Sequence, residues 1–174
     1  MEKVLDLKSA IRDVPDFPKK GIIFKDITPL LGQPELFKEI IEQTAAHFKT
    51  RNIDKVLAIE SRGFIFGGPL ACELGAGFVP IRKKGKLPYK TASASYSLEY
   101  GTDTLEMHED AFKPGERVLI ADDLLATGGT AKATAELAEK MGGKVAGFSF
   151  LIVLEFLNGR KKLEGYDIFS LIQY

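Results

Sequence analysis

Residues 118–130 read Val-Leu-Ile-Ala-Asp-Asp-Leu-Leu-Ala-Thr-Gly-Gly-Thr, and this stretch decides the fold class. The apolar run at 118–121 suits a short strand that is buried on both faces, as in parallel sheets. Two carboxylates, Asp122 and Asp123, follow it, and a helical pattern begins near Gly128. In an open α/β sheet, ligands bind just beyond the carboxyl ends of the strands. The stretch therefore predicts a binding site at a strand-to-helix turn.

The small residues of this turn favour a phosphate group. Backbone N–H groups and two hydroxyls at the amino end of the helix would come from Thr127, Gly128, Gly129 and Thr130. Such a helix end binds anions. The turn lacks the lysine of a nucleotide-triphosphate loop and the spaced glycines of a dinucleotide loop. Ionised carboxylates only accept hydrogen bonds, so the acidic pair suits a vicinal diol near one phosphate. The alternative is a helix N-cap beside two solvated acids.

The rest of the chain alternates between strand and helix patterns, which indicates a parallel sheet with helices around it. Further strands are expected at 55–59, 78–81 and 145–153, and helices at 4–11, 34–48, 64–74 and 130–141. Residues 14–33 are rich in proline and glycine and should be mostly loop. Residues 83–96 show no sustained period and predict a long loop, as in active-site lids. Strand-like residues at 95–100 and 104–108 would form a hairpin that carries it.

Length and composition exclude several classes of protein. A chain of 174 residues with a formal net charge of zero suits one domain without a global attraction to nucleic acid or acidic membranes. The longest apolar stretch, at 145–154, is too short to span a bilayer. Cys72 is the only cysteine, which excludes an internal disulfide and fits a reducing cytoplasm. We expect its thiol to be buried and inert. His47 and His108 lack cysteine partners, so a zinc site is not expected.

Other segments in chain order narrow the interpretation. They are Asp-Phe-Pro at 16–18, Gly-Ile-Ile-Phe-Lys-Asp-Ile-Thr at 21–28, Glu-Ser-Arg-Gly-Phe at 60–64, Ile-Arg-Lys-Lys-Gly-Lys-Leu-Pro at 81–88 and Ser-Leu-Glu-Tyr-Gly at 97–101. Together with 118–130 they resemble the adenine phosphoribosyltransferase family of type I phosphoribosyltransferases over nearly the whole chain. The loop alone would indicate only the type I superfamily.

The resemblance implies a fold and a reaction. It implies a single α/β domain over residues 1–174, with an open, mainly parallel sheet flanked by helices. Residues 1–33 would form a hood over the base pocket, and residues 83–108 a flexible lid and its hairpin. The enzyme would transfer the phosphoribosyl group of phosphoribosyl pyrophosphate to N9 of adenine, giving AMP and pyrophosphate in purine salvage. The resemblance also implies a cytoplasmic homodimer, with Mg²⁺ held mainly by substrate and water, and neither nucleic acid nor membrane as a partner.

The resemblance also assigns residues to roles. Phosphoribosyl pyrophosphate and AMP would contact Ser61, Arg62, Lys83, Lys86, Tyr100, Asp122, Asp123, Ala126, Thr127, Gly128, Gly129 and Thr130. We call residues 126–130 the phosphate loop. Adenine would contact Ile23, Phe24, Lys25 and Leu154, and Arg82 would reach the neighbouring subunit's site. The family often has a non-proline cis peptide at the position of Glu60–Ser61. Many relatives have arginine where Lys25 stands, and the two differ in hydrogen-bond geometry.

The same resemblance implies that Glu99 and Arg62 are the catalytic residues. Relatives that act on 6-oxopurines carry an aspartate just before the Thr-Gly of the phosphate loop, close to purine N7. Ala126 stands there and cannot transfer a proton. A protonated Glu99, held near N7 under a closed lid, would donate a hydrogen bond instead.

Structural alternatives remain for these positions. Arg62 would be a surface residue on a turn, the basic run at 82–86 a solvated face, Phe24 and Leu154 ordinary core, and Glu99 an exposed hairpin residue. Two rival functions also remain: a 6-oxopurine phosphoribosyltransferase, and a regulator that binds phosphoribosyl pyrophosphate without catalysis. Such regulators add a DNA-binding domain, for which this chain has neither length nor basic charge.

Overall fold

A computed structural model describes residues 6–97 and 102–174. Its centre is a seven-stranded sheet in the order β5-β6-β4-β3-β7-β8-β9. The strands are β3 (Lys55–Ile59), β4 (Gly77–Lys83), β5 (Thr91–Ser97), β6 (Thr102–His108), β7 (Arg117–Leu125), β8 (Lys144–Val153) and β9 (Ile168–Gln173). The neighbours in the run β4-β3-β7-β8-β9 pair in parallel, whereas β6 pairs antiparallel with both β4 and β5. The predicted α/β fold with a mainly parallel sheet is confirmed.

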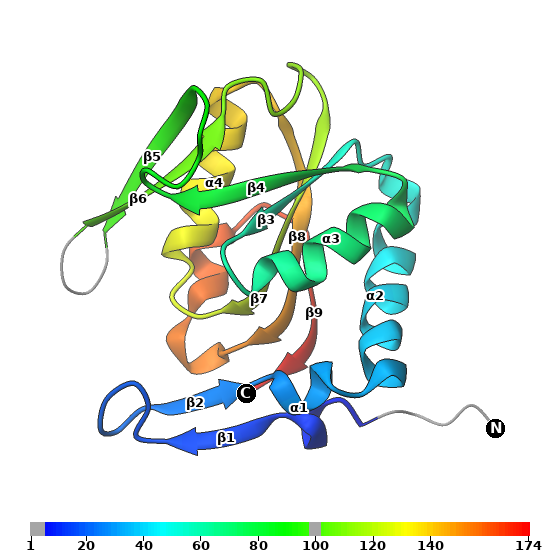
Figure 1. The fold of residues 1–174 in the computed structure, drawn as a ribbon, viewed down its shortest axis with the longest axis vertical. Coiled ribbons are helices and arrows are strands. Elements are labelled where there is room, and N and C mark those ends of the chain that lie inside the picture. The colour runs from blue at the N-terminus through cyan, green and yellow to red at the C-terminus, as the bar shows by residue number, and fades with distance from the viewer. Residues whose placement is uncertain (1–5, 98–101) are drawn as a thin grey trace.

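Helices cover both faces of this sheet (Figure 1). They are α1 (Thr28–Leu31), α2 (Pro34–Phe48), α3 (Gly63–Leu74) and α4 (Gly129–Lys140), with 3-10 turns at Lys8–Ala10, Lys49–Arg51, Glu155–Leu157 and Gly159–Leu163. The side chains of β3 alternate between the two layers. Val56 packs with Leu70 of α3, whereas Leu57 belongs to the core that contains Leu137 of α4. Because β3 packs against an apolar layer on each face of the sheet, the side chains on both of its faces are apolar, and its sequence is a continuous apolar run.

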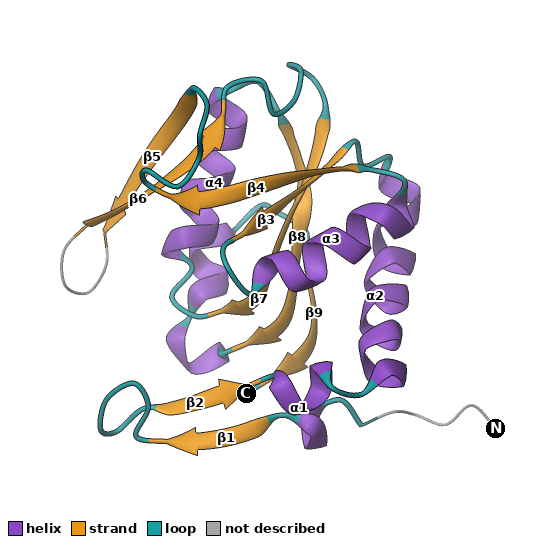
Figure 2. Ribbon diagram, viewed as in Figure 1, coloured by secondary structure: helices purple, strands orange, loops and turns teal. Residues whose placement is uncertain are grey.

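The hood is more regular than the sequence predicted. Residues 14–33 are not mostly loop, because β1 (Arg12–Pro15) and β2 (Ile23–Asp26) pair as an antiparallel hairpin, followed by α1. Of the prolines and glycines that suggested a loop, only Pro18 and Gly21 lie in the turn at 16–22, where the Phe17–Pro18 bond is cis and Gly21 has a φ of 88°. Pro15 ends β1, and Pro29 and Gly32 belong to α1 and its C-cap. Figure 2 shows this hairpin lying across the ends of the central strands.

Before its hairpin, the described part of the hood forms one 3-10 turn, Lys8–Ala10, rather than the helix predicted over 4–11. The amphipathic pattern of this segment predicts that Val4, Leu7 and Ile11 point inward. Leu7 and Ile11 are buried, and Val4 lies outside the described residues. Cys72 is exposed, not buried, because Leu70 and Ala71 occupy the inner side of α3 at this point. None of the helices in the described part of the chain is long and apolar enough to cross a membrane.

The expected long loop over 83–96 is wrong for its second half, because residues 91–97 form β5. Ala92, Ala94 and Tyr96 pack against the α4 core, and small polar residues alternate with them. Apolar and small polar residues do alternate with a period of two over 91–97, but threonine, serine and alanine together give only a weak strand signal. The predicted hairpin is present, but its first strand begins at residue 91 instead of 95. Its tip, residues 98–101, lies outside the described residues.

Candidate functional site

The two adjacent carboxylates lie inside β7, which runs on to Leu125 instead of ending before them. Neighbouring residues of a strand point to opposite faces, so the two side chains diverge. The Asp123 side chain is almost fully buried, with its Oδ2 2.9 Å from Nη2 of Arg62. Oδ1 of Asp122 accepts the Asp123 backbone N–H at 2.9 Å and lies beside the first turn of α3 at Gly63. Both line the same cleft, from different sides.

Burial dominates the electrostatics of this pair. It raises the pKa of Asp122 well above its usual range, and the neighbouring charge of Asp123 adds to that effect. Burial also raises the pKa of Asp123, although the Arg62 guanidinium opposes the rise. Two buried carboxylates in sequence therefore favour a ligand that supplies hydrogen-bond donors or positive charge.

The phosphate loop connects β7 to α4 and is shaped by a close backbone approach. Gly128, with a φ of 77°, is the N-cap of α4 and offers no capping side chain. A Cβ on Gly128 would lie 2.6 Å from the carbonyl oxygen of Gly159, and a Cβ on Gly159 only 2.1 Å from that of Ala126. The loop encloses a hollow of about 80 Å³, lined by Asp122, Leu124, Leu125, Ala126, Thr127, Gly128, Gly129, Thr130, Ala131 and Phe150. Its first helical N–H groups are thus placed for an anion.

A second turn, after β3, faces the same cleft. The Glu60–Ser61 peptide bond is cis, as the resemblance implied. Arg62 follows it and leads into α3, and its guanidinium carbon lies 4.9 Å from the centroid of the Phe24 ring. Since Arg62 also contacts Asp123, one side chain joins the hood to the floor of the cleft.

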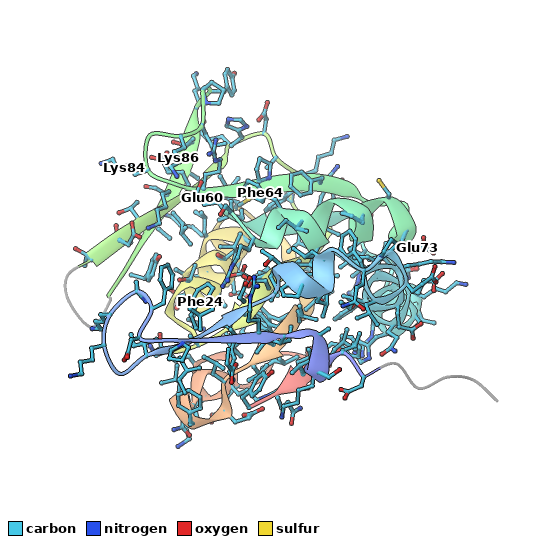
Figure 3. The ribbon with its side chains drawn as sticks, turned by 60° about the horizontal axis from the view of Figure 1, so that its bottom comes forward. Phe24, Glu60, Phe64, Glu73, Lys84 and Lys86 are labelled. Carbon is cyan, nitrogen blue, oxygen red and sulfur yellow. The ribbon has the colours of Figure 1, made fainter. Side chains whose placement is uncertain are left out.

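Carboxylates hold three of the cations of the basic turn, by which we mean residues 82–86. Nε of Arg82 lies 2.8 Å from Oε2 of Glu60, and Nζ of Lys86 lies 2.5 Å from Oε1 of the same residue. Figure 3 shows Glu60 and Lys86 close together, above the Phe24 of β2. Nζ of Lys83 lies 3.0 Å from Oδ2 of Asp103 on β6. In the single chain Arg82 is thus paired internally, and its reach to a neighbouring subunit stays a prediction.

These pairs change the ionisation of their members. Burial opposes the charge of Glu60, yet its hydrogen bonds to Lys86 and Arg82 outweigh that effect and lower the pKa of its carboxyl. The hydrogen bond between Lys83 and Asp103 raises the pKa of the ammonium and lowers that of the carboxyl. Each of these groups is therefore charged at neutral pH.

The described residues enclose a cleft of about 480 Å³ between the turns and the hood. Its lining is Phe24, Ile59, Glu60, Ser61, Arg62, Lys83, Tyr96, Asp103, Leu105, Asp122, Asp123, Leu124 and Thr130. Sequence reasoning missed Glu60, Tyr96 and Asp103 as site residues. The only signal for Tyr96 was the alternation with Ala92 and Ala94.

A separate cavity of about 550 Å³, which we call the base pocket, lies under the hood. It is lined by Lys19, Gly21, Ile22, Ile23, Lys25, Thr127, Leu154, Phe156, Leu157 and Tyr174. Three of the candidates for adenine, Ile23, Lys25 and Leu154, line it, and Phe24 lines the adjoining cleft instead. Sequence reasoning missed Tyr174, because it did not identify β9, which precedes that residue.

The structure thus gathers the predicted residues around one end of the sheet, apart from Glu99 and Tyr100, which lie outside the described residues. Over residues 6–97 and 102–174, no group of three or more histidine, cysteine, aspartate or glutamate side chains could hold a metal ion. A divalent ion at this site would need ligands from the substrate or water.

Comparisons with known proteins agree with this geometry. The family model described as the phosphoribosyl transferase domain matches residues 27–172. The adenine phosphoribosyltransferase of Kosmotoga olearia is 59% identical, covering 98% of this chain and 100% of its own. The crystal structure of the Rhodothermus marinus adenine phosphoribosyltransferase has a TM-score of 0.93 at 60% identity, covering 97% and 96% of the two chains.

A more distant structure, from Saccharomyces cerevisiae, was solved with adenine and D-2,5-dideoxy-2,5-imino-altritol 1,6-bisphosphate. It has a TM-score of 0.90 at 42% identity and covers 94% of this chain and 95% of its own.

Proposed function

This chain belongs to the phosphoribosyl transferase domain family, and we infer that it transfers the phosphoribosyl group of phosphoribosyl pyrophosphate to adenine. The products are AMP and pyrophosphate, and the reaction salvages a purine. One observation carries this inference: relatives of the same length, named adenine phosphoribosyltransferase, match nearly the whole chain at 56% to 59% identity. The cleft supports it with an anion-binding loop, an acidic pair and paired cations around one space.

We propose the following placement of phosphoribosyl pyrophosphate. Its 5′-phosphate binds the N–H groups and hydroxyls of the phosphate loop, Ala126 to Thr130, and its ribose diol hydrogen-bonds to Asp123 and Asp122. Its pyrophosphate lies against Ser61 and Arg62, with Lys83 and Lys86 from the basic turn. Tyr100 contributes from the hairpin. Lys83 is the easier cation to release, because its pair with Asp103 is more exposed than the pair of Lys86 with the buried Glu60.

The base would lie under the hood, between Phe24 and Leu154 and beside Ile23 and Lys25. N9 of adenine forms a bond to C1 of the ribose as the bond from C1 to pyrophosphate breaks. Pyrophosphate leaves with its electron pair, N9 gives up its proton to water, and the configuration at C1 inverts. Glu99 donates a hydrogen bond to N7 as electron density leaves the purine. Arg62 balances the charge that grows on the departing pyrophosphate.

We propose that Mg²⁺ enters with phosphoribosyl pyrophosphate, held by the diol, the pyrophosphate and water. Bound there, it would neutralise charge on the leaving group. Asp122 and Asp123 are the carboxylates that would orient the diol toward it.

We also propose a homodimer that works in the cytoplasm. An apolar face on α3 and β4 supports the dimer. Ile65 and Phe78 are 38% and 41% exposed, the Phe64 ring packs against Phe78 at 5.8 Å, and the position of Gly68 is open. Contiguous exposed apolar residues of this kind mark protein interfaces. Arg82 follows Phe78 in β4, so a partner subunit on this face would come close to the basic turn.

One assay tests the reaction and separates it from its rivals. AMP formation from adenine is measured with phosphoribosyl pyrophosphate and Mg²⁺, and compared with product formation from hypoxanthine, guanine and xanthine. We expect adenine to be strongly preferred, because Ala126 cannot serve a 6-oxopurine as an acid or base. A preference for hypoxanthine would assign the chain to the 6-oxopurine enzymes. Binding of phosphoribosyl pyrophosphate without turnover of any base would indicate a regulator.

A further inference from the structure

The ring of Tyr174 is in contact with two lysines at the seam between the hood and the sheet. The ammonium of Lys25, on β2, lies 3.8 Å from the ring centroid, and the ammonium of Lys8 lies 4.4 Å from it. Cations over an aromatic face are attracted by its electron density. The ring therefore attracts two segments that come from the amino-terminal part of the chain.

The main chain of Tyr174 is fixed to the end of β8. Its N–H donates to the carbonyl of Val153 at 3.0 Å, and its carbonyl accepts the N–H of Glu155 at 2.8 Å. These two residues flank Leu154, a wall of the base pocket. The ring is thus held at a constant position relative to that wall.

The ammonium of Lys25 is already fully engaged at this seam. Its Nζ lies 2.6 Å from Oδ1 of Asp13, and its side chain is only 11% exposed. The stem of Lys25 lines the base pocket, whereas the charged end is held by the ring and by Asp13. Lys8 adds a hydrogen bond from its Nζ to the carbonyl of Gln173 at 2.9 Å.

We propose that Tyr174 is a positioning residue for the base: its ring holds Lys25 and thereby fixes β2 over the base pocket. We call this contact between the Tyr174 ring and the Lys25 ammonium the clamp. Because Ile23, Phe24 and Lys25 are consecutive in β2, the clamp sets the distance between the hood and Leu154. The proposal rests on the proposed transfer to adenine. It assigns the charge of Lys25 to the clamp and leaves only its stem to the base.

The kinetic test compares Tyr174→Leu with Tyr174→Phe. Loss of the ring should raise KM for adenine roughly tenfold, as expected for loss of partly buried cation–π contacts. KM for phosphoribosyl pyrophosphate should change much less, because most of its proposed contacts lie in the other cleft. Tyr174→Phe should restore the wild-type KM for adenine, because the attraction comes from the ring and not from the hydroxyl. Equal damage by both variants, or an equal rise in both KM values, would overturn the proposal.

Tyr166→Leu is the matched control. Tyr166 also has a lysine over its ring, Lys132 at 5.6 Å, but it packs on the α4 side of the sheet. Its loss should leave KM for adenine unchanged. Tyr174→Leu combined with Lys25→Met should be no worse than either change alone, because both remove the same contact. Additive effects would contradict the clamp.

Amide hydrogen exchange of β2 provides a readout that does not depend on activity. Exchange at Ile23–Asp26 should become faster in Tyr174→Leu and stay as in the wild type in Tyr166→Leu. Unchanged exchange in Tyr174→Leu would overturn the clamp even if KM rose. Should the wild type fail to form AMP, the proposed function falls, and this measurement still decides whether the clamp exists.

Discussion

At the residue scale, Asp122 and Asp123 are neighbours with different surroundings. Asp123 pairs with Arg62, whereas Asp122 turns toward the start of α3 and accepts the N–H of Asp123. The difference follows from the strand, which sends consecutive side chains to opposite faces. Both still line the cleft, so a ribose diol between them would receive an acceptor from each side.

Replacing either acid should weaken the binding of phosphoribosyl pyrophosphate. For Asp122→Ala or Asp123→Ala we expect a loss of about 1.5–3 kcal/mol, the range for hydrogen bonds to charged groups. Titration calorimetry with Mg²⁺ present measures it. Asp110→Ala, which removes an exposed acid in the turn after β6, is the control and should leave the affinity unchanged. Unchanged affinity in both cleft variants would remove the acidic pair from the site.

Glu99 is expected to act on the base and not on phosphoribosyl pyrophosphate. Glu99→Gln or Glu99→Ala should lower kcat about 10²-fold or more, the usual range for general acid–base groups. Steady-state kinetics with adenine, together with the affinity for phosphoribosyl pyrophosphate, separates the two effects. Glu109→Gln, at an exposed acid near the other end of the hairpin, serves as the control. Near-normal turnover by Glu99→Ala would show that the acid lies elsewhere.

At the element scale, the phosphate loop depends on the 3-10 turn Gly159–Leu163 behind it. The carbonyl oxygen of Gly159 leaves no room for a Cβ on Gly128, and the carbonyl oxygen of Ala126 leaves none for a Cβ on Gly159. The shape of the loop is therefore set by a segment that follows β8, not by the loop sequence alone.

Gly159→Ala should displace the phosphate loop. We expect a loss of about 1–3 kcal/mol in the free energy of unfolding from overpacking, together with weaker binding of phosphoribosyl pyrophosphate. Urea denaturation and calorimetry measure the two effects. Gly32→Ala is the control, because its φ is −72° and its nearest new contact would be an ordinary 3.5 Å. If Gly159→Ala bound phosphoribosyl pyrophosphate as tightly as the wild type does, the loop would not depend on this turn.

The hood should lose stability in acid through Asp26. The backbone N–H of Thr28 and the guanidinium of Arg12 hold the pKa of its carboxyl at about 2, against 3.8 for the free group. A lowered pKa stabilises the fold above the unfolded value, and that stability is lost as pH falls through the folded one. Allowing for the exposure of Arg12, Asp26→Asn should cost about 1–2 kcal/mol at pH 7.

That cost should shrink between about pH 4 and pH 2, the window set by the two pKa values. Urea denaturation of the wild type and Asp26→Asn at several pH values measures it, with Asp110→Asn as the control. A gap that stays constant down to pH 2 would show that the stabilisation does not come from ionisation.

The elements that the sequence predicted well are those with a single dominant pattern. The strand at 55–59 and the helix at 34–48 match the structure because a continuous apolar run and a helical period leave little choice. The hood hairpin and the first part of β5 were missed, because prolines and glycines around one turn and small polar residues in one strand conceal a period of two. The paired cations could not be predicted, since Glu60 and Lys86 meet only through the alignment of β3 with β4 and the turn beyond it.

At the scale of the whole molecule, the apolar face of α3 and β4 predicts the assembly. Ile65→Lys combined with Phe78→Lys should convert a dimer into a monomer, because buried lysines at an interface are costly. Analytical ultracentrifugation over a range of concentrations measures the change. Phe17→Lys, at an exposed aromatic residue of the hood turn, is the control and should sediment like the wild type. A fully active wild-type monomer at working concentration would refute the dimer.

The internal pairing of the basic turn has a consequence for how an anionic substrate is captured. The chain has zero net charge, and Glu60 and Asp103 offset two of the three positive charges on Arg82, Lys83 and Lys86, so this cluster projects a weakened long-range field. Steering through the solvent therefore contributes less to the encounter than it would with three unpaired cations. The substrate is recognised on contact, when its anionic groups replace Glu60 or Asp103 as the partners of these cations. Ionic strength screens distant charges far more than touching ones, so capture by this protein is suited to the salt of a cell.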